Sequence, residues 1–208
     1  MTDPLSAISI ATREYARLVD CTMYTHHDRV SEYAHAIAVS VSSDYNLSEL
    51  ETELIKAYAA FHDIGKLALP KDLLYKPRKL TDLEMVVVRT HSAEGLVVVE
   101  RILNQVGEDH FMRPDMLRRM VGDHHERLDG SGYPRHLRGE EIFPEVRIVM
   151  VADAYDAITS HRPYQKQKSI DYAFRELDAE VDQGRMCGKC VRGLKDYVNK
   201  QGLFREEP

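Results

Sequence analysis

PEVRIVMVADAYDAI, residues 144–158, is the stretch that decides the predicted fold class. Pro144 suits the first turn of a helix, and the residues after it are apolar on nearly every face of that helix. A helix that is apolar all round must be covered on all sides by other parts of the protein. We therefore expect residues 144–158 to form a buried helix, with the carboxylate of Asp153 lying among apolar neighbours.

The segment from residue 26 to residue 41 has the period of an amphipathic helix. Apolar residues and one histidine recur at spacings of three and four, which places them on one stripe of the helix surface. The stripe consists of His26, Val30, Tyr33, Ala34, Ile37 and Val41. We expect the His26 side chain to face inward, and that of His27 to do so to a lesser extent.

Start signals for three further helices lie between these two segments. Ser48 and Glu51 form a capping-box pattern, and Thr81 and Glu84 form another. Pro114 stands at the beginning of a further segment with one apolar face. The chain therefore has five predicted helices up to residue 158.

The remaining patterns define the fold class. Two stretches rich in breaking residues, 67–80 and 127–140, are expected to be loops. The alternation typical of β-strands is absent, so the sequence predicts an all-α fold, a single-domain helical bundle. We divide it into an N-terminal helical extension, a core, and a C-terminal helical segment that completes the same domain. These parts span residues 1–21, 22–170 and 171–208.

Composition limits the possible functions. The 208 residues suffice for one well-packed domain, and 43% hydrophobic with 30% charged residues is typical of a globular protein. The net charge of −6 argues against broad adhesion to DNA or to an anionic membrane. No apolar run approaches the roughly 20 residues of a membrane span. The amino terminus lacks a secretory pattern, and three cysteines are too few for a disulfide framework, so we expect a cytoplasmic protein.

Side chains that can bind metal are spread over the five predicted helices. The helix opened at Ser48 is expected to reach HDIGK (62–66), so that Lys66 points into the same cavity as the histidine and aspartate if the helix continues. The helix opened at Thr81 is expected to carry a further histidine. The candidate ligands are His26, His62, Asp63, His91, His124, His125 and Asp153.

Taken singly, most candidates have an alternative structural explanation. His62 and Asp63 would then mark a helix end at the surface, and His91 would be a hydrogen-bonded core histidine. One of the adjacent residues His124 and His125 would be solvated, because neighbours on a helix lie about 100° apart.

Asp153 strengthens the case for a site. An unpaired carboxylate on such an apolar helix would cost roughly several kcal/mol, so it needs a cation or a hydrogen-bond partner. A pair with a basic residue such as Arg147 or Arg162 is the alternative to a metal ion.

Together, the candidates favour a two-metal centre in the core of the bundle. Imidazole and carboxylate ligands suit iron, manganese, zinc or nickel better than calcium or magnesium. Two octahedral ions offer about twelve positions, of which seven ligands with Asp63 bridging would fill about eight. The open positions would serve water and substrate oxygens, and two ions can activate that water for attack on phosphorus. Lys66 would add positive charge beside the phosphate.

The motifs resemble the HD-GYP domain, a branch of the HD phosphohydrolases that hydrolyses the bacterial second messenger cyclic di-GMP. They are HDIGK (62–66), the later His91, HHERLDGSGYP (124–134) and VADAYDAITSHRPY (151–164), in this order. The resemblance covers roughly residues 22–170. It implies an all-helical bundle with a di-iron or di-manganese centre, with zinc or nickel as alternatives.

The resemblance also implies a role for each residue. Metal ligands would be His26, His62, Asp63, His91, His124, His125 and Asp153, with Asp63 bridging. Asp63 and Lys66 would be catalytic, and Lys66 and Arg162 would contact the substrate phosphates. The GYP loop, Gly132-Tyr133-Pro134, would shape the edge of the site, with Tyr133 beside the substrate, and can contact GGDEF-domain partners.

Two positions depart from the pattern of the family. Some members carry a glutamate for a third metal where this chain has Thr22, so we expect two metals and linear pGpG as the main product, with further hydrolysis to GMP left open. Gln165, followed by Lys166, stands where a basic residue often follows the RPY motif, which weakens the case for phosphate contact there. No sensory domain is recognised, so we expect input from a separate partner or from the metal and redox state.

Rival interpretations remain open at this point. The chain could hydrolyse another cyclic dinucleotide, or could be a non-catalytic module that binds the nucleotide or a GGDEF protein, although such a module would be expected to have lost ligands. Cys187 and Cys190 form a CxxC without the second pair of a zinc site, so we interpret their spacing as incidental. GRMCGKC (184–190) is one residue short of a phosphate-binding loop and lacks its final Ser or Thr.

Overall fold

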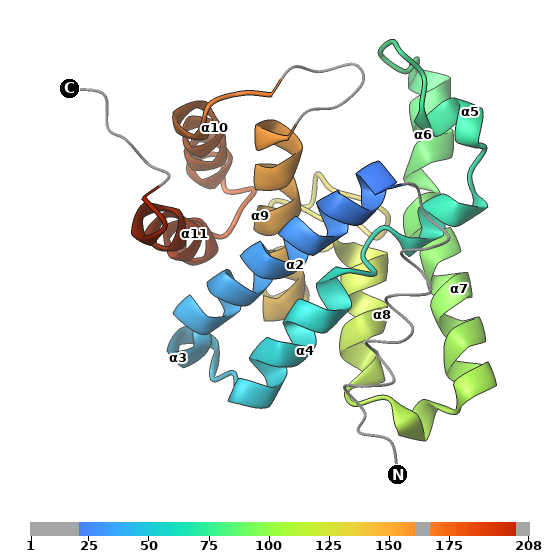
Figure 1. The fold of residues 1–208 in the computed structure, drawn as a ribbon, viewed down its shortest axis with the longest axis horizontal. Coiled ribbons are helices and arrows are strands. Elements are labelled where there is room, and N and C mark those ends of the chain that lie inside the picture. Colours follow the sequence, from blue (N-terminus) through green and yellow to red (C-terminus); the bar gives the residue numbers. More distant parts are fainter. Residues whose placement is uncertain (1–20, 161–166, 203–208) are drawn as a thin grey trace.

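The structure is a computed structural model that describes residues 21–160 and 167–202. Within these ranges the chain is helical and contains no β-strand, only one isolated bridge between Asp129 and Arg138 (Figure 1). The α-helices are α2 (Cys21–Ser40), α3 (Ser42–Tyr45), α4 (Glu49–Ala59), α5 (Lys71–Leu74), α6 (Asp82–Arg89), α7 (His91–Val106), α8 (Pro114–Asp123), α9 (Pro144–Thr159), α10 (Ile170–Asp182) and α11 (Gly188–Lys200). The 3-10 helices are η1 (Ile64–Ala68), η2 (Glu108–His110) and η3 (Gly139–Glu141).

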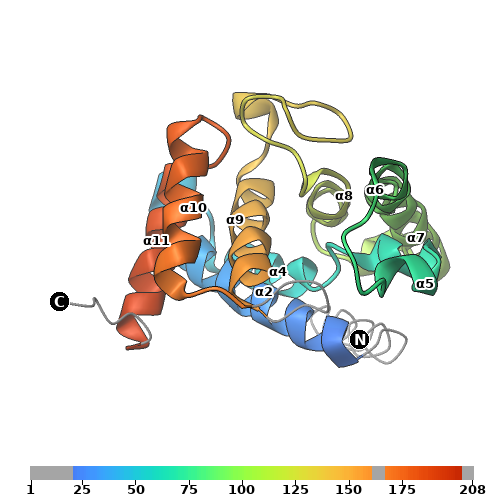
Figure 2. The same cartoon turned by 90° about the horizontal axis from the view of Figure 1, so that it is seen from above.

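Helix α9 lies at the centre of the bundle, as its sequence predicts. Every residue from Glu145 to Ala152 is buried, and the helix packs against α2, α8, α10 and α11. Viewed from above, α9 lies between the α10–α11 pair and α8 (Figure 2). Its first residue is Pro144, whose missing N–H costs nothing in the first turn. The all-α bundle is confirmed.

The helix starts that were predicted from local sequence signals are also present in the structure. Ser48 with Glu51 at α4 and Thr81 with Glu84 at α6 form complete capping boxes, in which each side chain satisfies a backbone N–H of the other residue. Pro114 is the first residue of α8. These signals are read within four residues of the chain, so they need no information about tertiary packing.

The expected helix through His62 does not continue. Helix α4 ends at Ala59, and the chain then tightens, with backbone bonds from Phe61 to Tyr58 and from His62 to Ala59. The 3-10 helix η1 follows. Asp63 therefore lies in a tight turn and Lys66 in η1, instead of both lying in one continuous α-helix.

Two further boundaries differ from the prediction. The expected loop 67–80 contains the short helix α5. The helix opened at Thr81 ends at Arg89, because the Thr90 hydroxyl donates to the Val87 carbonyl oxygen at 2.8 Å and the Thr90 N–H donates to Val87 as well. His91 is consequently the first residue of a new helix, α7.

The C-terminal helices pack against the core. Helix α10 contacts α9, and α11 contacts both α2 and α9. Our division of the chain at residues 22 and 170 stays a prediction.

None of the helices within the described ranges is long and apolar enough to cross a lipid bilayer.

Helix α7 approaches η1 very closely, and this contact brings His91 beside the HD turn. The space at Gly65 is so small that an added Cβ would lie 1.9 Å from the carbonyl oxygen of His91 and 2.4 Å from the backbone nitrogen of Gly95. Only glycine fits there. The close approach thus depends on the glycine of the HDIGK motif.

We predict that Gly65→Ala lowers the free energy of unfolding by at least about 3 kcal/mol, the upper end for an overpacked site, because backbone atoms cannot rotate away from the new methyl group. Gly95→Ala is the matched control, since its Cβ would first meet a side-chain methyl of Val121, at 2.6 Å, which can turn aside. Urea denaturation measures both variants. Equal losses of stability, or a fully stable Gly65→Ala protein, would contradict the argument.

Candidate metal centre

Five segments of the bundle bring all seven predicted ligands into one cluster. His26 comes from α2 and Asp153 from α9, while the others lie at helix ends. The turn after α4 carries His62 and Asp63, the first turn of α7 carries His91, and the end of α8 carries the adjacent pair. In each of two groups, the potential ligand atoms all lie within 4.8 Å of one another. The groups are Asp63 with His91, His124 and His125, and Asp153 with His26 and His62.

Asp63 lies between the two groups, and its two oxygens face different histidines. Oδ1 is 3.3 Å from Nε2 of His91 and 3.7 Å from Nε2 of His124. Oδ2 is 3.4 Å from Nε2 of His62 and 3.7 Å from Nε2 of His26. The two oxygens of Asp63 are thus each close to a different pair of histidine rings.

Asp153 completes the group around His26. Its Oδ1 is 3.5 Å from Nε2 of His26 and 3.8 Å from Nε2 of His62. The alternative pairing with Arg147 is wrong, because that guanidinium donates to the carbonyl oxygens of Ile142 and Gly139 instead. The other candidate partner, Arg162, lies outside the described residues.

Helix C-termini orient three of the histidine rings. The Nδ1–H of His62 donates to the carbonyl oxygen of Ala59 at 2.7 Å, three residues earlier at the end of α4. The Nδ1–H of His91 reaches the carbonyl of Val88 at 2.7 Å, and that of His124 reaches Val121 at 3.0 Å. The last carbonyls of a helix have no partner inside it, so they are available to fix the ring and its tautomer. Each ring then presents Nε2 to the cluster.

The Nε2 lone pairs of these buried rings are suited to bind a cation. With Nδ1–H committed to a carbonyl, a neutral ring has a lone pair at Nε2, and the Nε2 atoms of His91 and His124 are only 3.3 Å apart. Nε2 of His62 and Oδ1 of Asp63 are buried and have no hydrogen-bond partner among the described residues. Buried polar atoms without a partner are rare, and positive charge would satisfy all of them. The cluster can therefore hold metal.

The pKa values of several side chains in the cluster differ strongly from their ordinary values. Burial alone would raise the pKa of Asp63, but the ammonium of Lys66 and the imidazole of His62 outweigh it and hold the pKa well below the usual range. Burial and the neighbouring His124 lower the pKa of His125 well below the ordinary value. An ionised carboxylate beside an uncharged imidazole is the state in which both can bind a metal ion.

Asp156 is a functional candidate that the sequence interpretation missed. Its Oδ2 accepts the Nδ1–H of His26 at 2.7 Å, and Arg29 holds Oδ1. Burial opposes protonation of His26, but Asp156, Asp63 and Asp153 outweigh burial and raise the pKa of His26 to about 9. The available signal was a second aspartate three residues after Asp153, on the same side of a buried helix.

His27 is more buried than predicted. Only 3% of it is exposed, and its ring packs against those of His26 and His62, each at 5.4 Å between centroids. Burial and His62 lower its pKa well below the ordinary value. A ligand atom of His27 also lies within 4.8 Å of ligand atoms of His26 and Asp63. The expectation that His27 faces less inward than His26 is wrong, because α2 packs on both α4 and α9.

Lys66 lies at the mouth of the cluster. Its ammonium forms an ion pair with Oδ2 of Asp63. Together with His124, His125 and Asp153 it lines a cavity of about 390 Å³, whose outer wall includes Arg127. The prediction that His62, Asp63 and Lys66 point into one cavity depended on a continuing helix, which is absent. Lys66 shares the cavity with the predicted ligands His124, His125 and Asp153, but neither His62 nor Asp63 is among its lining residues.

The GYP loop supports the second histidine group. Glu126 is fully buried and accepts the backbone N–H groups of Arg135 at 2.6 Å and Leu137 at 3.0 Å, which ties the loop to the end of α8. The ring of Tyr133 stacks on that of His125 at 4.8 Å, and the guanidinium of Arg89 lies 5.0 Å from the centre of the Tyr133 ring. Neither Glu126 nor Arg89 was a candidate, although Glu126 lies inside the quoted motif.

The two cysteines of the CxxC lie outside these ligand groups. Both are buried and free, and the Sγ of Cys187 is 3.0 Å from the Tyr45 hydroxyl. Neither belongs to a group of potential metal ligands among the described residues.

The chain is similar to known proteins in sequence and in fold. A family model described as HD domain matches residues 13–187. The chain is 41% identical over 162 residues to the cyclic di-GMP phosphodiesterase response regulator RpfG of Xanthomonas campestris pv. campestris, which covers 76% of this chain and 40% of that protein. It is 34% identical over 188 residues to the 3'3'-cGAMP-specific phosphodiesterase 3 of Vibrio cholerae, and this match covers 89% of this chain and 38% of that protein. The chain thus spans about two fifths of the length of these relatives.

A solved structure shares the fold. Bd1817, described as an HDG"Y"P protein from Bdellovibrio bacteriovorus, superposes with a TM-score of 0.62 at 20% identity, covering 85% of this chain and 52% of that one.

We predict that metal binding releases a proton from His26. A pKa of about 9 means that His26 is protonated at neutral pH in the metal-free protein, and a metal ion at Nε2 must displace that proton. The apparent affinity for Mn²⁺ should therefore rise by about tenfold per pH unit between about pH 6.5 and 8.5. Calorimetric titration in buffers of different ionisation enthalpy measures the release. An affinity that does not change with pH would contradict the prediction.

We also predict that Asp156→Asn lowers metal affinity by about 10- to 100-fold, the usual cost of losing a residue that orients a metal ligand. The same variant should release fewer protons at neutral pH, because the pKa of His26 falls when its carboxylate partner is lost. Asp178→Asn is the matched control, since Asp178 pairs with Lys195 on the surface. If both variants bind Mn²⁺ as the parent protein does, Asp156 does not support the centre.

Proposed function

The chain belongs to the HD domain family and carries the motifs of its HD-GYP branch, and we propose that it is a metal-dependent phosphodiesterase of cyclic dinucleotides. Cyclic di-GMP is the proposed substrate and linear pGpG the main product. The observation that carries the proposal is the position of Asp63, whose two oxygens each lie 3.3–3.7 Å from separate histidines. The relatives described above, named as phosphodiesterases of cyclic di-GMP and of 3'3'-cGAMP, support the substrate class.

The proposed cofactor is a pair of divalent ions, iron or manganese before zinc or nickel. Imidazole and carboxylate ligands in this ratio suit these metals. One ion would be held by Asp153, His26 and His62. The other ion would be held by His91, His124 and His125, and Asp63 would contribute a ligand to each ion. When bound, the pair supplies an activated water and neutralises charge on the phosphate. Thr22, where some members of the family have a glutamate, is the reason to propose two ions rather than three.

The protein's own groups would position the substrate. The Lys66 ammonium, which lines the 390 Å³ cavity beside Asp153, is placed to hold a phosphate oxygen and to stabilise the negative charge of the transition state. Asp156 would hold the Nδ1–H of His26, which keeps the ring in one orientation. Tyr133 braces His125 and would border the substrate, and Arg162 is the proposed second phosphate contact.

A non-catalytic role is not favoured by the site. A binding module that no longer hydrolyses nucleotide would be expected to have lost ligands, and none of the seven is missing. The proposed surface for a GGDEF-domain partner is the outer part of the GYP loop, where Pro134, Arg135 and His136 are exposed.

We predict that His62→Ala and Asp63→Ala each abolish hydrolysis of cyclic di-GMP, with a loss greater than the roughly 100-fold that removal of a supporting residue can cost. Each should also lower the amount of bound metal. Protein purified without oxygen is analysed for metal, and turnover is followed by chromatography. His110→Ala, which removes an exposed histidine of η2, should match the parent protein. Undiminished turnover in the two site variants would overturn the proposal, and so would bound metal with no turnover of any cyclic dinucleotide.

A further inference from the structure

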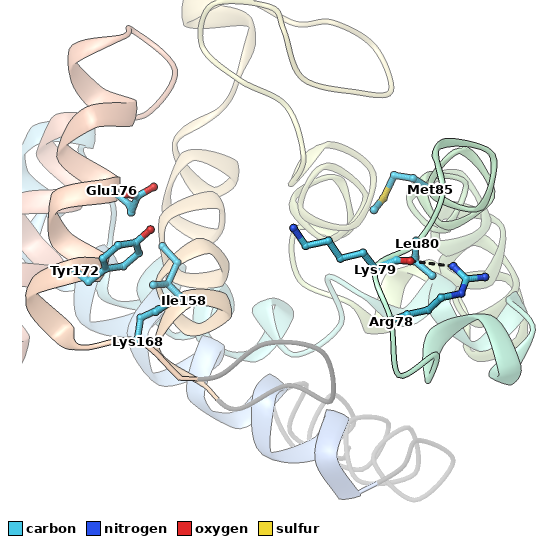
Figure 3. Close-up of a pocket in the computed structure, with 8 residues that line it drawn as sticks. All are labelled: Arg78, Lys79, Leu80, Met85, Ile158, Lys168, Tyr172 and Glu176. Atoms are coloured by element: carbon cyan, nitrogen blue, oxygen red, sulfur yellow. Dashed lines mark hydrogen bonds between the residues drawn. The ribbon is translucent and has the colours of Figure 1, made fainter.

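A second, larger cavity opens beside the candidate metal centre. It has a volume of about 610 Å³, within the range of sites that bind small molecules. One wall comes from the segment that enters α6, and the other from α9 and α10 (Figure 3). Leu80 and Met85 on the first wall face Ile158 and the ring of Tyr172 on the second. Apolar side chains thus contribute to both walls of the cavity.

This cavity adjoins the one at the metal centre. Ile158 and Glu176 line both of them. Ile158 lies five residues after Asp153 on α9, which is about 7.5 Å along the helix axis. A ligand whose one half lies at Asp153 and Lys66 can therefore place its other half in the larger cavity. A cyclic dinucleotide has two such halves, each with a phosphate and a base.

Positive charge faces the cavity from both walls. The side chain of Lys79 extends from the first wall toward the second (Figure 3), and Lys168 lies on the second wall, where its Nζ is 5.4 Å from the centre of the Tyr172 ring. No carboxylate of the described residues pairs with either ammonium, whereas the guanidinium of Arg78 is bound to Glu84. Two unpaired ammonium groups in a protein with an overall negative charge favour an anionic ligand.

Glu176 lies where the two cavities meet. Its carboxylate points into the gap (Figure 3), and no ion pair to it occurs among the described residues. A carboxylate only accepts hydrogen bonds. Guanine offers two donors on its Watson–Crick edge, N1–H and N2–H, which a carboxylate can accept together. Adenine has a lone pair at N1, which the same carboxylate would repel, so Glu176 can distinguish the two bases.

We propose that the larger cavity is the subsite for the second nucleotide of the substrate and that it selects guanine. Lys79 and Lys168 face the phosphate that is not cleaved, and Glu176 accepts the guanine edge. This inference rests on the proposed function, because it requires the other phosphate to lie at the metal centre.

The test compares three substrates in the metal-loaded protein: cyclic di-GMP, cyclic di-AMP and bis(p-nitrophenyl) phosphate, which has no base. Glu176→Gln should lower kcat/KM for cyclic di-GMP by about tenfold or more, the usual value of a bidentate contact to a base, and leave the other two substrates unchanged. Glu49→Gln is the matched control, because Glu49 is exposed at the end of α4 farthest from His62. The double variant Lys79→Ala and Lys168→Ala should raise KM for cyclic di-GMP and not for the nitrophenyl ester.

The possible results separate the two proposals. If Glu176→Gln lowers hydrolysis of all three substrates alike, or keeps the full preference for guanine, the subsite is wrong while the phosphodiesterase proposal stands. A parent protein that prefers cyclic di-AMP would also overturn guanine selection. If the parent protein hydrolyses none of the three substrates, the proposed function fails, and the subsite fails with it.

Discussion

A buried carboxylate between two sets of imidazoles is the constraint on which the rest of the structure depends. The side chain of Asp63 is only 3% exposed, and its two oxygens face different histidine groups. An isolated anion in such a place would cost several kcal/mol or more, so the surrounding segments must supply positive charge or hydrogen-bond donors. Lys66 supplies part of that charge from the same turn. Within the part of the chain that the structure describes, the remaining oxygen, Oδ1, has no hydrogen-bond partner, which is the simplest physical reason to expect cations in the cluster.

The bundle satisfies this constraint mainly through the ends of its helices. His62, His91 and His124 each follow a helix carbonyl by three residues and bind it through Nδ1, so that the terminal carbonyl gains a donor and the ring gains a fixed direction. The ends of these helices at the cluster are therefore needed to orient its histidine rings. The site also requires the close contact between Gly65 and α7, because this contact brings Nε2 of His91 to within 3.3 Å of Oδ1 of Asp63.

The parts of the fold that the sequence predicts well are those encoded locally. The buried helix α9 and the two capping boxes are read from neighbouring residues, and the structure contains them at the expected positions. What could not be predicted depends on packing between distant segments. Adjacent residues on α2 point about 100° apart, and only the contact of α2 with both α4 and α9 explains why His27 is buried as well as His26. Likewise, the loop carbonyls that bind Arg147, and so separate it from Asp153, become its neighbours only when the loop folds back. Asp156 was visible in the sequence, but its pairing with α2 was not.

The central proposal, that Asp63 joins two ions in one cluster, can be tested directly by electron paramagnetic resonance of the protein loaded with Mn²⁺. A carboxylate that bridges two manganese ions couples their spins, so the account predicts two ions per chain and the broad spectrum of a coupled pair. In Asp63→Asn the coupling should weaken or disappear. A single bound ion per chain, or two ions that give only the six-line spectrum of isolated Mn²⁺, would contradict the account.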